Sequence, residues 1–445
     1  MQKNRTQSAT TECNQVEFAF SRAKGRKVTA DFQGGDISSD GGLTLIREVD
    51  RILNLSKRAA SSLCDDRQQT KVHHGALNLL QSRLYGLCAG WEDLNDFDQL
   101  RKDCLYQSMT GRDVELASPA TLCRFENQQN RKAALDISEL LVDVFIESFD
   151  SAPEKLVLDF DATDDPVHGH QEKRFFHGYY NHHCFLPLYV FCGDQLLCAY
   201  LRPSNIDASK HTAAILKLLV DKLRKHWPKC DFTLRADSGF CRKHILRWCE
   251  THKVSYIIGI AGNQRLQKLA ASVQQNAAEA YEATGQKQRL FSSFDYAARS
   301  WSTSRRIIHK AEHTRKGANG RFVVTNLQGD AQQLYDTNYC ARGNMENRIK
   351  EQMLLFSDRT SAHQWWTNQY RLLLSALAYT LMEALRRLGL KDTVLEKAQV
   401  DTIRLKLIKI GAVITRNTRR VCIHLSQAYP LKELFAQLVS KLVPS

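Results

Sequence analysis

The sequence predicts a mixed α/β core that lies between a mainly helical N-terminal region and a helical C-terminal tail. Three short apolar runs follow one another closely, with the sequences KLVLDFDA, CFLPLYVFC and QLLCAYLRP. A helical pattern and an apolar run then alternate twice, ending at VSYIIGIA. Three strands in quick succession, followed by alternating helices and strands, are typical of a mixed α/β order.

Helical signals dominate the chain before this core. The segment LTLIREVDRILNL is amphipathic, and residues 73–91 place apolar side chains at helical spacing. Ser118 and Pro119 stand where the N-cap and the first turn of a helix are expected. We therefore expect a mainly helical domain over residues 31–150, preceded by a flexible basic N-terminus over residues 1–30.

Residues 263–336 interrupt the core pattern. A polar helical stretch is followed by three β-like runs with the sequences SFDYAARSW, RRIIHKAEHT and RFVVTNL. We expect these runs to pair antiparallel in a mostly separate β-rich insertion. The core then comprises residues 151–262 and 337–390, and a basic helical tail follows over residues 391–445.

Composition indicates a polyanionic partner. The chain of 445 residues carries a formal net charge of +14, which favours nucleic acid as the partner. No run of 18 apolar residues occurs and the N-terminus lacks the apolar stretch of a signal peptide, so we expect no membrane span and a cytoplasmic location. The thirteen cysteines contain no C-x-x-C pair, so neither a zinc ribbon nor a disulfide framework is predicted.

Carboxylates gather where two predicted strands end. Asp161 closes the apolar run LVLDFD, and Asp237 closes the run FTLRAD. Glu346 lies on a later predicted helix. Three carboxylates can converge on one site if the strands are neighbours, and crowded carboxylates repel one another unless positive charge lies among them. Such a site would suit two hard divalent cations, Mg²⁺ or Mn²⁺, which can activate water and stabilise a leaving oxygen in phosphodiester cleavage.

The segment YCARGNMENRIK surrounds this glutamate with phosphate-binding side chains. Tyr339, Arg342, Glu346 and Lys350 follow one another at spacings of three, four and four, so a helix can place all four on one face. This arrangement suits a metal ligand beside a phosphate clamp. An ordinary surface helix with two ion pairs explains the same spacing, and the residues alone leave both interpretations open.

The sequence resembles the DDE transposases of bacterial insertion sequences, in particular insertion sequence family 1380. The matching stretches span roughly residues 30–385 in the order of that family. They are DGGLTLIREVD, GWEDLNDFDQLRKD, ASPATLCRFEN, LDFDATDDPVHGHQE, LPLYVF, LRADSGF, RFVVTNL and YCARGNMENRIKE. The resemblance implies an RNase H-like core interrupted by a β-rich insertion, and it implies DNA binding for the helical region 31–150.

The resemblance also implies a role for each acid. Asp161 opens the D-x-T signature and would be the first catalytic and metal-binding acid, with Asp237 the second and Glu346 the third. Tyr339, Arg342 and Lys350 would position DNA phosphates. The lysine of that family's signature usually lies seven residues after the glutamate, where this chain has Met353, so Lys350 is assigned in its place.

The implied activity is cut-and-paste DNA transposition. The protein would bind the terminal inverted repeats of its element, cleave the DNA with metal-activated water and join the freed 3′-OH ends to target DNA. Because two ends must be brought together, a homodimer on double-stranded DNA is expected.

Two other functions fit parts of the sequence. LDFDAT also matches the D-x-D-x-T motif of haloacid dehalogenase-type phosphatases, in which Asp159 would be the nucleophile and Asp161 the acid/base. A non-catalytic DNA-binding relative of the transposases is the second alternative. Outside the acids, the histidine- and aromatic-rich residues 168–183 indicate a loop or hairpin near DNA, and Trp301 suits either a base-stacking role or, preferably, a core position.

Overall fold

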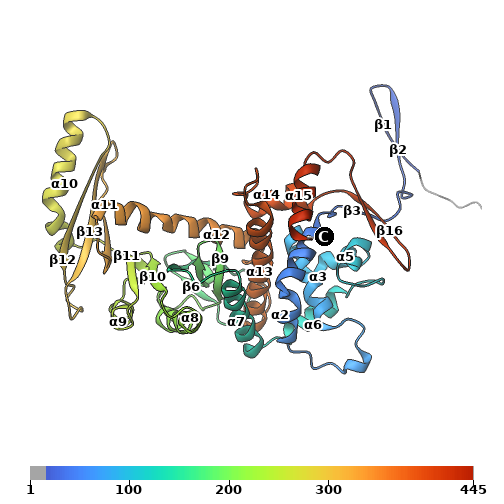
Figure 1. Cartoon of the computed structure of the whole chain (residues 1–445), viewed down its shortest axis with the longest axis horizontal. Coiled ribbons are helices and arrows are strands. Elements are labelled where there is room, and N and C mark those ends of the chain that lie inside the picture. Colours follow the sequence, from blue (N-terminus) through green and yellow to red (C-terminus); the bar gives the residue numbers. More distant parts are fainter. Residues whose placement is uncertain (1–16, 444–445) are drawn as a thin grey trace, which may run out of the picture.

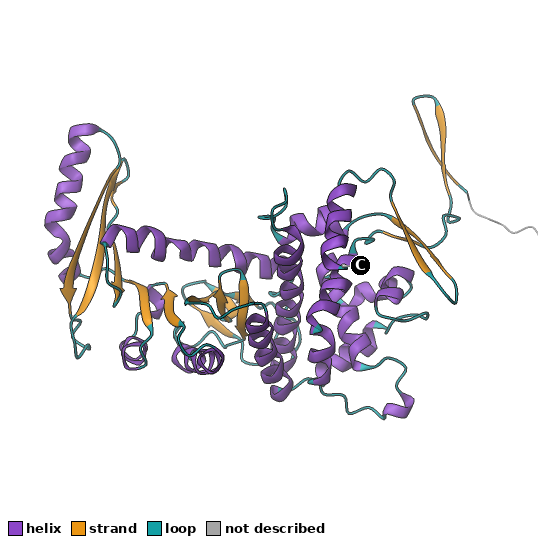
Figure 2. Cartoon of the chain, in the orientation of Figure 1, coloured by secondary structure: helices purple, strands orange, loops and turns teal. Residues whose placement is uncertain are grey.

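The structure is a computed structural model that describes residues 17–443. The described part of the chain is elongated (Figure 1), with the helix α10 at one end and two β-hairpins at the other. Strands lie in the left half of the view and at its right end, and a block of helices separates them (Figure 2).

One large mixed sheet forms the centre of the molecule. Five of its strands lie in the order β9-β8-β4-β10-β11. Their bounds are β4 Lys155–Ala162, β8 Leu188–Cys192, β9 Gln195–Tyr200, β10 Asp231–Ala236 and β11 Ser255–Ile260. β4 and β9 each pair antiparallel with β8, whereas β10 is parallel to both β4 and β11. The mixed α/β order predicted from the sequence is confirmed.

Two crossover helices make the parallel strands possible. α8 (Thr212–His226) joins β9 to β10, and α9 (Lys243–Thr251) joins β10 to β11. Leu216 and Leu223 of α8 and Leu246 of α9 are buried in one apolar cluster with strand residues such as Phe160 and Leu234. Parallel strands require such crossovers, and burial of the helix faces stabilises them.

A long buried helix connects the sheet to the N-terminal helices. Nearly every residue of α13 (Trp365–Leu385) is buried. It contacts β9 and α7 (Arg131–Glu147) as well as α1 (Leu43–Leu53) and α3 (Ala76–Ala89). Its apolar side chains therefore belong to a single core shared with the N-terminal helices.

The remaining N-terminal helices begin as local signals predict. They are α2 (Leu55–Ser61), α4 (Phe97–Leu100), α5 (Cys104–Met109) and α6 (Pro119–Asn127). The Ser118 hydroxyl accepts a hydrogen bond from the Thr121 backbone N–H, and Pro119 occupies the first turn of α6.

Residues 263–336 do not form a separate subdomain, so that expectation is wrong. β12 (Gln288–Tyr296), β13 (Arg305–Thr314) and β15 (Arg321–Thr325) pair antiparallel as expected, but β15 also pairs with β11 and extends the central sheet. Val323 and Val324 of β15 are fully buried. β11 would otherwise present an unpaired edge, and pairing with an apolar strand satisfies its backbone groups. α10 (Gln264–Thr284) covers β12 and β13.

The two terminal regions also differ from expectation. Residues 18–30 form a hairpin of β1 (Phe18–Ala23) and β2 (Arg26–Ala30) instead of a flexible segment, and residues 1–16 lie outside the described part of the chain. The C-terminal tail is not wholly helical. It contains β16 (Ala412–Arg416), β17 (Val421–Leu425) and the helix α15 (Lys432–Leu442).

The C-terminal strands form because β16 pairs with a strand that lies far from it in the sequence. β16 pairs with β17 and with β3 (Ile37–Ser38), so three short strands form one small sheet. β-branched residues on both sides of the turn at 417–420 suit this sheet.

Two absences hold over residues 17–443. No helix in that range is both long and apolar enough to cross a membrane. Each of the twelve cysteines in it is free.

Candidate active site

Two of the candidate acids lie side by side at one edge of the central sheet. Asp161 is the penultimate residue of β4, and Asp237 directly follows β10. The two strands are parallel neighbours with Ala236 opposite Phe160, so residues 161 and 237 emerge together. Asp237 accepts a hydrogen bond from the Gly239 backbone N–H at 2.8 Å, which holds its carboxylate at the start of the following turn.

The Arg342 side chain links Glu346, the third acid, to Asp161. It directly precedes α12 (Gly343–Leu354), the helix that carries Glu346. The Arg342 guanidinium donates from Nη2 to Glu346 Oε1 at 2.6 Å and from Nη1 to Asp161 Oδ2 at 3.1 Å. Asp161 and Glu346, which are 185 residues apart in the sequence, therefore share one cation.

Burial and the neighbouring carboxylates make ionisation of Asp161 unfavourable. The Asp161 side chain is 15% exposed, and its pKa is raised to about 6. Burial is the largest cause, and the negative charges of Asp237 and Glu346 raise the pKa further. The Arg342 guanidinium and the Ala162 backbone N–H act in the opposite direction. The site thus has excess negative charge that a single arginine does not neutralise.

Tyr339 lies against the same edge of the sheet. A Cβ at Gly259 of β11 would lie 2.6 Å from the Tyr339 phenol oxygen, so only glycine leaves room for the ring. Burial is the main cause that raises the pKa of Tyr339, and the nearby Asp237 charge adds to it while Arg342 opposes it. The phenol therefore lies within electrostatic reach of Asp237 and Arg342.

Lys350 is not drawn into this cluster. It is exposed on α12, one helical turn after Glu346, and no ion pair among the described residues includes it. Met353, at the position where the related signature has its lysine, is partly buried against the core.

Sequence reasoning missed Arg235, which positions the segment before Glu346. This β10 residue binds both oxygens of Asp159, with Nη2 at 2.7 Å from Oδ2, and its Nη1 donates to the Asn338 carbonyl at 2.6 Å. Asp159 is 2% exposed. An arginine within the apolar run FTLRAD was the available signal, because a buried charge needs a buried partner. With both oxygens occupied, Asp159 is not available as the nucleophile of a phosphatase.

A second buried ion pair anchors the far half of α12. Glu351 is fully buried and accepts hydrogen bonds from Arg348 Nη1 at 2.9 Å and from Arg386 Nη1 at 3.0 Å. Arg348 also contacts Asp194 in the turn between β8 and β9, at 2.9 Å. The helix is thus held to both α13's end and the sheet, while Glu346 on its first turn stays half exposed.

An aromatic hairpin lies beside the acids. β6 (Phe175–His177) and β7 (His182–Phe185) pair with each other, and β7 pairs with β5 (Asp165–Pro166), which begins three residues after β4 ends. His182 Nε2 lies 2.9 Å from Asp164 Oδ2, and the Tyr179 side chain at the tip is 86% exposed. The expected hairpin within residues 168–183 is present.

Trp301, by contrast, occupies a packing position. Its ring lies 5.6 Å from that of Tyr296 and beneath the Arg305 guanidinium at 4.9 Å. It packs against the apolar cluster of the sheet, in line with the preferred core interpretation.

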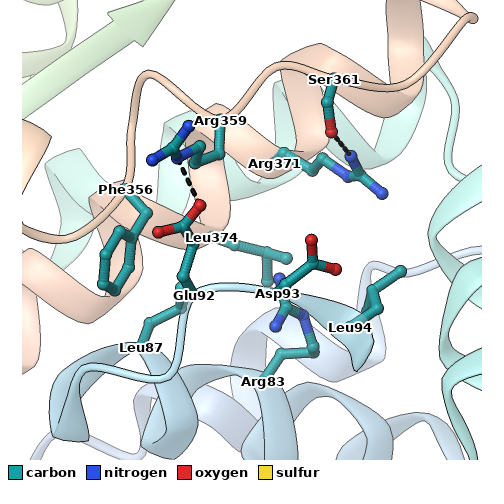
Figure 3. Close-up of a pocket in the computed structure, with 10 residues that line it drawn as sticks. All are labelled: Arg83, Leu87, Glu92, Asp93, Leu94, Phe356, Arg359, Ser361, Arg371 and Leu374. Carbon is teal, nitrogen blue, oxygen red and sulfur yellow. Dashed lines mark hydrogen bonds and ion pairs between the residues drawn. The ribbon is translucent and has the colours of Figure 1, made fainter. Parts of the chain in front are cut away.

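No preformed metal cage marks the acid cluster in the described part of the chain. Among residues 17–443, no three possible ligands lie close enough together to hold a metal ion. A pocket does occur between α3 and the segment before α13, and it includes none of the candidate site residues (Figure 3). Its lining is Arg83, Leu87, Glu92, Asp93, Leu94, Phe356, Arg359, Ser361, Arg371 and Leu374.

Comparison with known proteins decides the family. Residues 20–445 match the family described as Transposase DDE domain group 1. The chain belongs to this DDE transposase family. No curated protein matches the sequence. Among solved structures, the piggyBac transposase in its synaptic complex with hairpin DNA is similar at 10% identity and a TM-score of 0.45. That similarity covers 83% of this chain and 80% of the other.

Proposed function

We propose that this protein is a DNA transposase of the insertion sequence 1380 type, which cleaves the ends of its element and joins their 3′-OH groups to target DNA. The observation that carries the proposal is the convergence of Asp161 and Glu346 on Arg342, with Asp237 at the adjacent strand end. Membership of the DDE transposase family supports the same assignment. The strand order β9-β8-β4-β10-β11 supports an RNase H-like core.

The three carboxylates would supply the oxygen ligands of two Mg²⁺ or Mn²⁺ ions once Arg342 no longer pairs with them. They are hard oxygen donors, and burial, together with the charges of Asp237 and Glu346, raises the pKa of Asp161, so a bound cation would be favourable there. Asp161, Asp237 and Glu346 would hold the ions, and Arg342 would release both carboxylates when it turns to a DNA phosphate. When bound, such ions supply an activated water and stabilise the leaving oxygen.

The side chains around the acids would orient the DNA strand. Arg342 presents a planar guanidinium, which binds phosphate oxygens through two parallel donors. Tyr339 is fixed against Gly259 and offers a phenol next to Asp237. Lys350 is exposed on the same helix and is free to approach the flanking phosphate. These contacts would hold the scissile phosphate in line with the attacking oxygen.

The partner DNA and the assembly follow from the chemistry. We propose that the terminal inverted repeats and the target DNA bind as duplexes, mainly through phosphate contacts of this basic chain. Joining two ends requires two sites, which favours a homodimer on DNA in the bacterial cytoplasm, at the nucleoid.

A cleavage assay tests the proposal. The full chain is incubated with duplex DNA that carries the element's end, with Mg²⁺ and, separately, with Ca²⁺. Asp161→Asn, Asp237→Asn and Glu346→Gln should each abolish cleavage and leave end binding within about twofold, because binding rests on other phosphate contacts. Cleavage retained in Asp237→Asn would refute the three-acid site. Loss of activity in Asp159→Asn but not in Asp161→Asn would refute the assignment of the first acid. Binding without cleavage by the unaltered chain would indicate a non-catalytic relative.

A further inference from the structure

A basic hairpin projects from the end of the molecule that lies opposite α10. β1 and β2 pair antiparallel from Phe18 opposite Ala30 to Ala23 opposite Arg26, with a register shift between Phe20 and Ala23. Lys24 and Gly25 form the turn with φ of +48° and +81°. Two central residues with positive φ are typical of the two-residue turns that connect hairpins. Apart from Val28, every residue of the two strands is exposed, so the hairpin stands away from the body (Figure 1).

The tip of this hairpin concentrates positive charge. Arg22, Lys24, Arg26 and Lys27 fall within six residues, and residues 18–30 contain no acid. No ion pair among the described residues includes any of these four cations. Unpaired cations at an exposed tip favour a polyanionic partner.

A second basic tip lies at the same end of the molecule. The turn between β16 and β17 carries Arg416, Arg419 and Arg420, and the last two are exposed. β16 pairs with β3, which begins seven residues after β2 ends, and the Ile414 backbone N–H donates to the Asp36 carbonyl at 2.8 Å. The second hairpin is therefore part of the small sheet, and the first hairpin is joined to that sheet by residues 31–36 (Figure 1).

The length and width of the first hairpin suit a DNA groove, and its low stability in isolation favours a bound partner. An isolated two-stranded hairpin is only marginally stable in water, so a partner that orders it is favoured. A β-ribbon of this width enters the major groove, which is about 12 Å wide. The five residues of β2 extend about 17 Å, the length of about five base pairs.

We propose that the two hairpins, with Arg22, Lys24, Arg26 and Lys27 on one and Arg419 and Arg420 on the other, form a duplex-DNA binding site remote from the acids. The first hairpin enters a groove of the element's end, and the second contacts neighbouring phosphates of the same duplex. This site would be a DNA contact of the proposed transposase. That the duplex is the element's end rests on the proposed function.

The test measures the salt dependence of DNA binding. The full-length protein and the variant Arg22→Gln/Lys24→Gln/Arg26→Gln/Lys27→Gln are titrated, in Ca²⁺, onto a fluorescent duplex carrying the element's end, at several NaCl concentrations. Each lost phosphate contact lowers the slope of log K against log salt by about 0.9, so the slope should fall by up to about 3.6. Arg419→Gln/Arg420→Gln should lower it by up to about 1.8.

A matched variant controls for net charge. Lys217, Lys225, Lys229 and Lys243 are exposed, lie on or beside α8 and α9, and take part in none of the described ion pairs. Replacing all four with glutamine removes the same charge and should change the slope by less than half as much. Hydroxyl-radical footprints of the first hairpin variant should also lose protection over about five base pairs, whereas the control should keep it.

Three outcomes would overturn the proposal. One is a slope change below about one unit in the first hairpin variant, and another is an equal change in the control. The third is an unchanged slope with altered self-association in sedimentation without DNA, because that result would place a second copy of the chain on the exposed Phe18 and Phe20. Asp161→Asn, assayed in parallel, separates the two proposals. If it still cleaves DNA, the proposed chemistry fails while the slope result for the hairpins stands.

Discussion

Replacing Asp161 with asparagine should stabilise the folded protein at neutral pH while it removes activity. The substitution keeps the size of the side chain and its ability to accept a hydrogen bond from Arg342, which lies 3.1 Å away. It removes a negative charge that is largely buried beside two other carboxylates. If the acids bind cations as proposed, their cluster should lower the stability of the protein when no cation is bound.

The magnitude follows from the pKa of this carboxyl group. Its pKa is raised from 3.8 to about 6. Because the folded state then binds the proton more tightly than the unfolded state, the free energy of unfolding falls as pH rises between these values. With these two values, ionisation of Asp161 costs less than about 1 kcal/mol at pH 4, about 2 kcal/mol at pH 5 and about 3 kcal/mol at pH 8. The Asp161→Asn variant would avoid this cost, so its gain in stability should grow with pH in the same proportion.

Urea unfolding followed by tryptophan fluorescence measures this gain. The unaltered protein and the Asp161→Asn variant are compared at pH 4, 5 and 8, without divalent cations and at one ionic strength. Asp221→Asn provides the control, because Asp221 is an exposed residue of α8 that takes part in none of the described ion pairs. That control should change the free energy of unfolding by less than about 0.5 kcal/mol at every pH.

Two results would refute the reasoning. If Asp161→Asn destabilised the protein at pH 8, the carboxylate would be stabilised by Arg342 more than it is penalised by burial. If the gain were the same at pH 4 and pH 8, it would not arise from ionisation of Asp161. Addition of Mg²⁺ should stabilise the unaltered protein and leave the variant nearly unaffected, which links the stability change to cation binding.

Three further predictions concern the surroundings of the acids. Arg342→Ala should lower the cleavage rate about 100-fold or more because a phosphate donor is lost, while the salt slope of end binding falls by about one unit at most; full cleavage with a lowered melting temperature would leave Arg342 a structural role only. Tyr179→Ala should weaken binding to a pre-cleaved end about five- to 150-fold if its exposed ring stacks on a base, and Tyr179→Phe should restore binding; equal affinities for the two variants would exclude stacking. Arg386→Ala removes one of the two cations that pair with the buried Glu351 carboxylate and should lower the free energy of unfolding, measured by urea unfolding, by about 3–5 kcal/mol. A loss below about 1 kcal/mol would show that Arg348 suffices to hold α12.

Local patterns were enough to predict much of the fold and the candidate site. The apolar runs ending in Asp161 and Asp237 are strands of one sheet, because short apolar segments bounded by turns bury best as strands. The i, i+4 spacing of Arg342 and Glu346 predicted their contact, since helix geometry brings such side chains together. Ser118 and Pro119 marked the start of α6 for equally local reasons.

The sequence by itself thus determined the type and order of the core elements and the acids at their ends, because those depend on neighbouring residues. Only the tertiary structure decided what pairs across long separations. β15 continues the central sheet through β11, and β16 pairs with β3, about 375 residues earlier in the chain. Arg235 joins Asp159 to the segment before Glu346 in the same way. Such contacts form because the unpaired backbone groups of a strand edge and the charge of a buried side chain both need a partner. The local sequence does not indicate which residue that partner is.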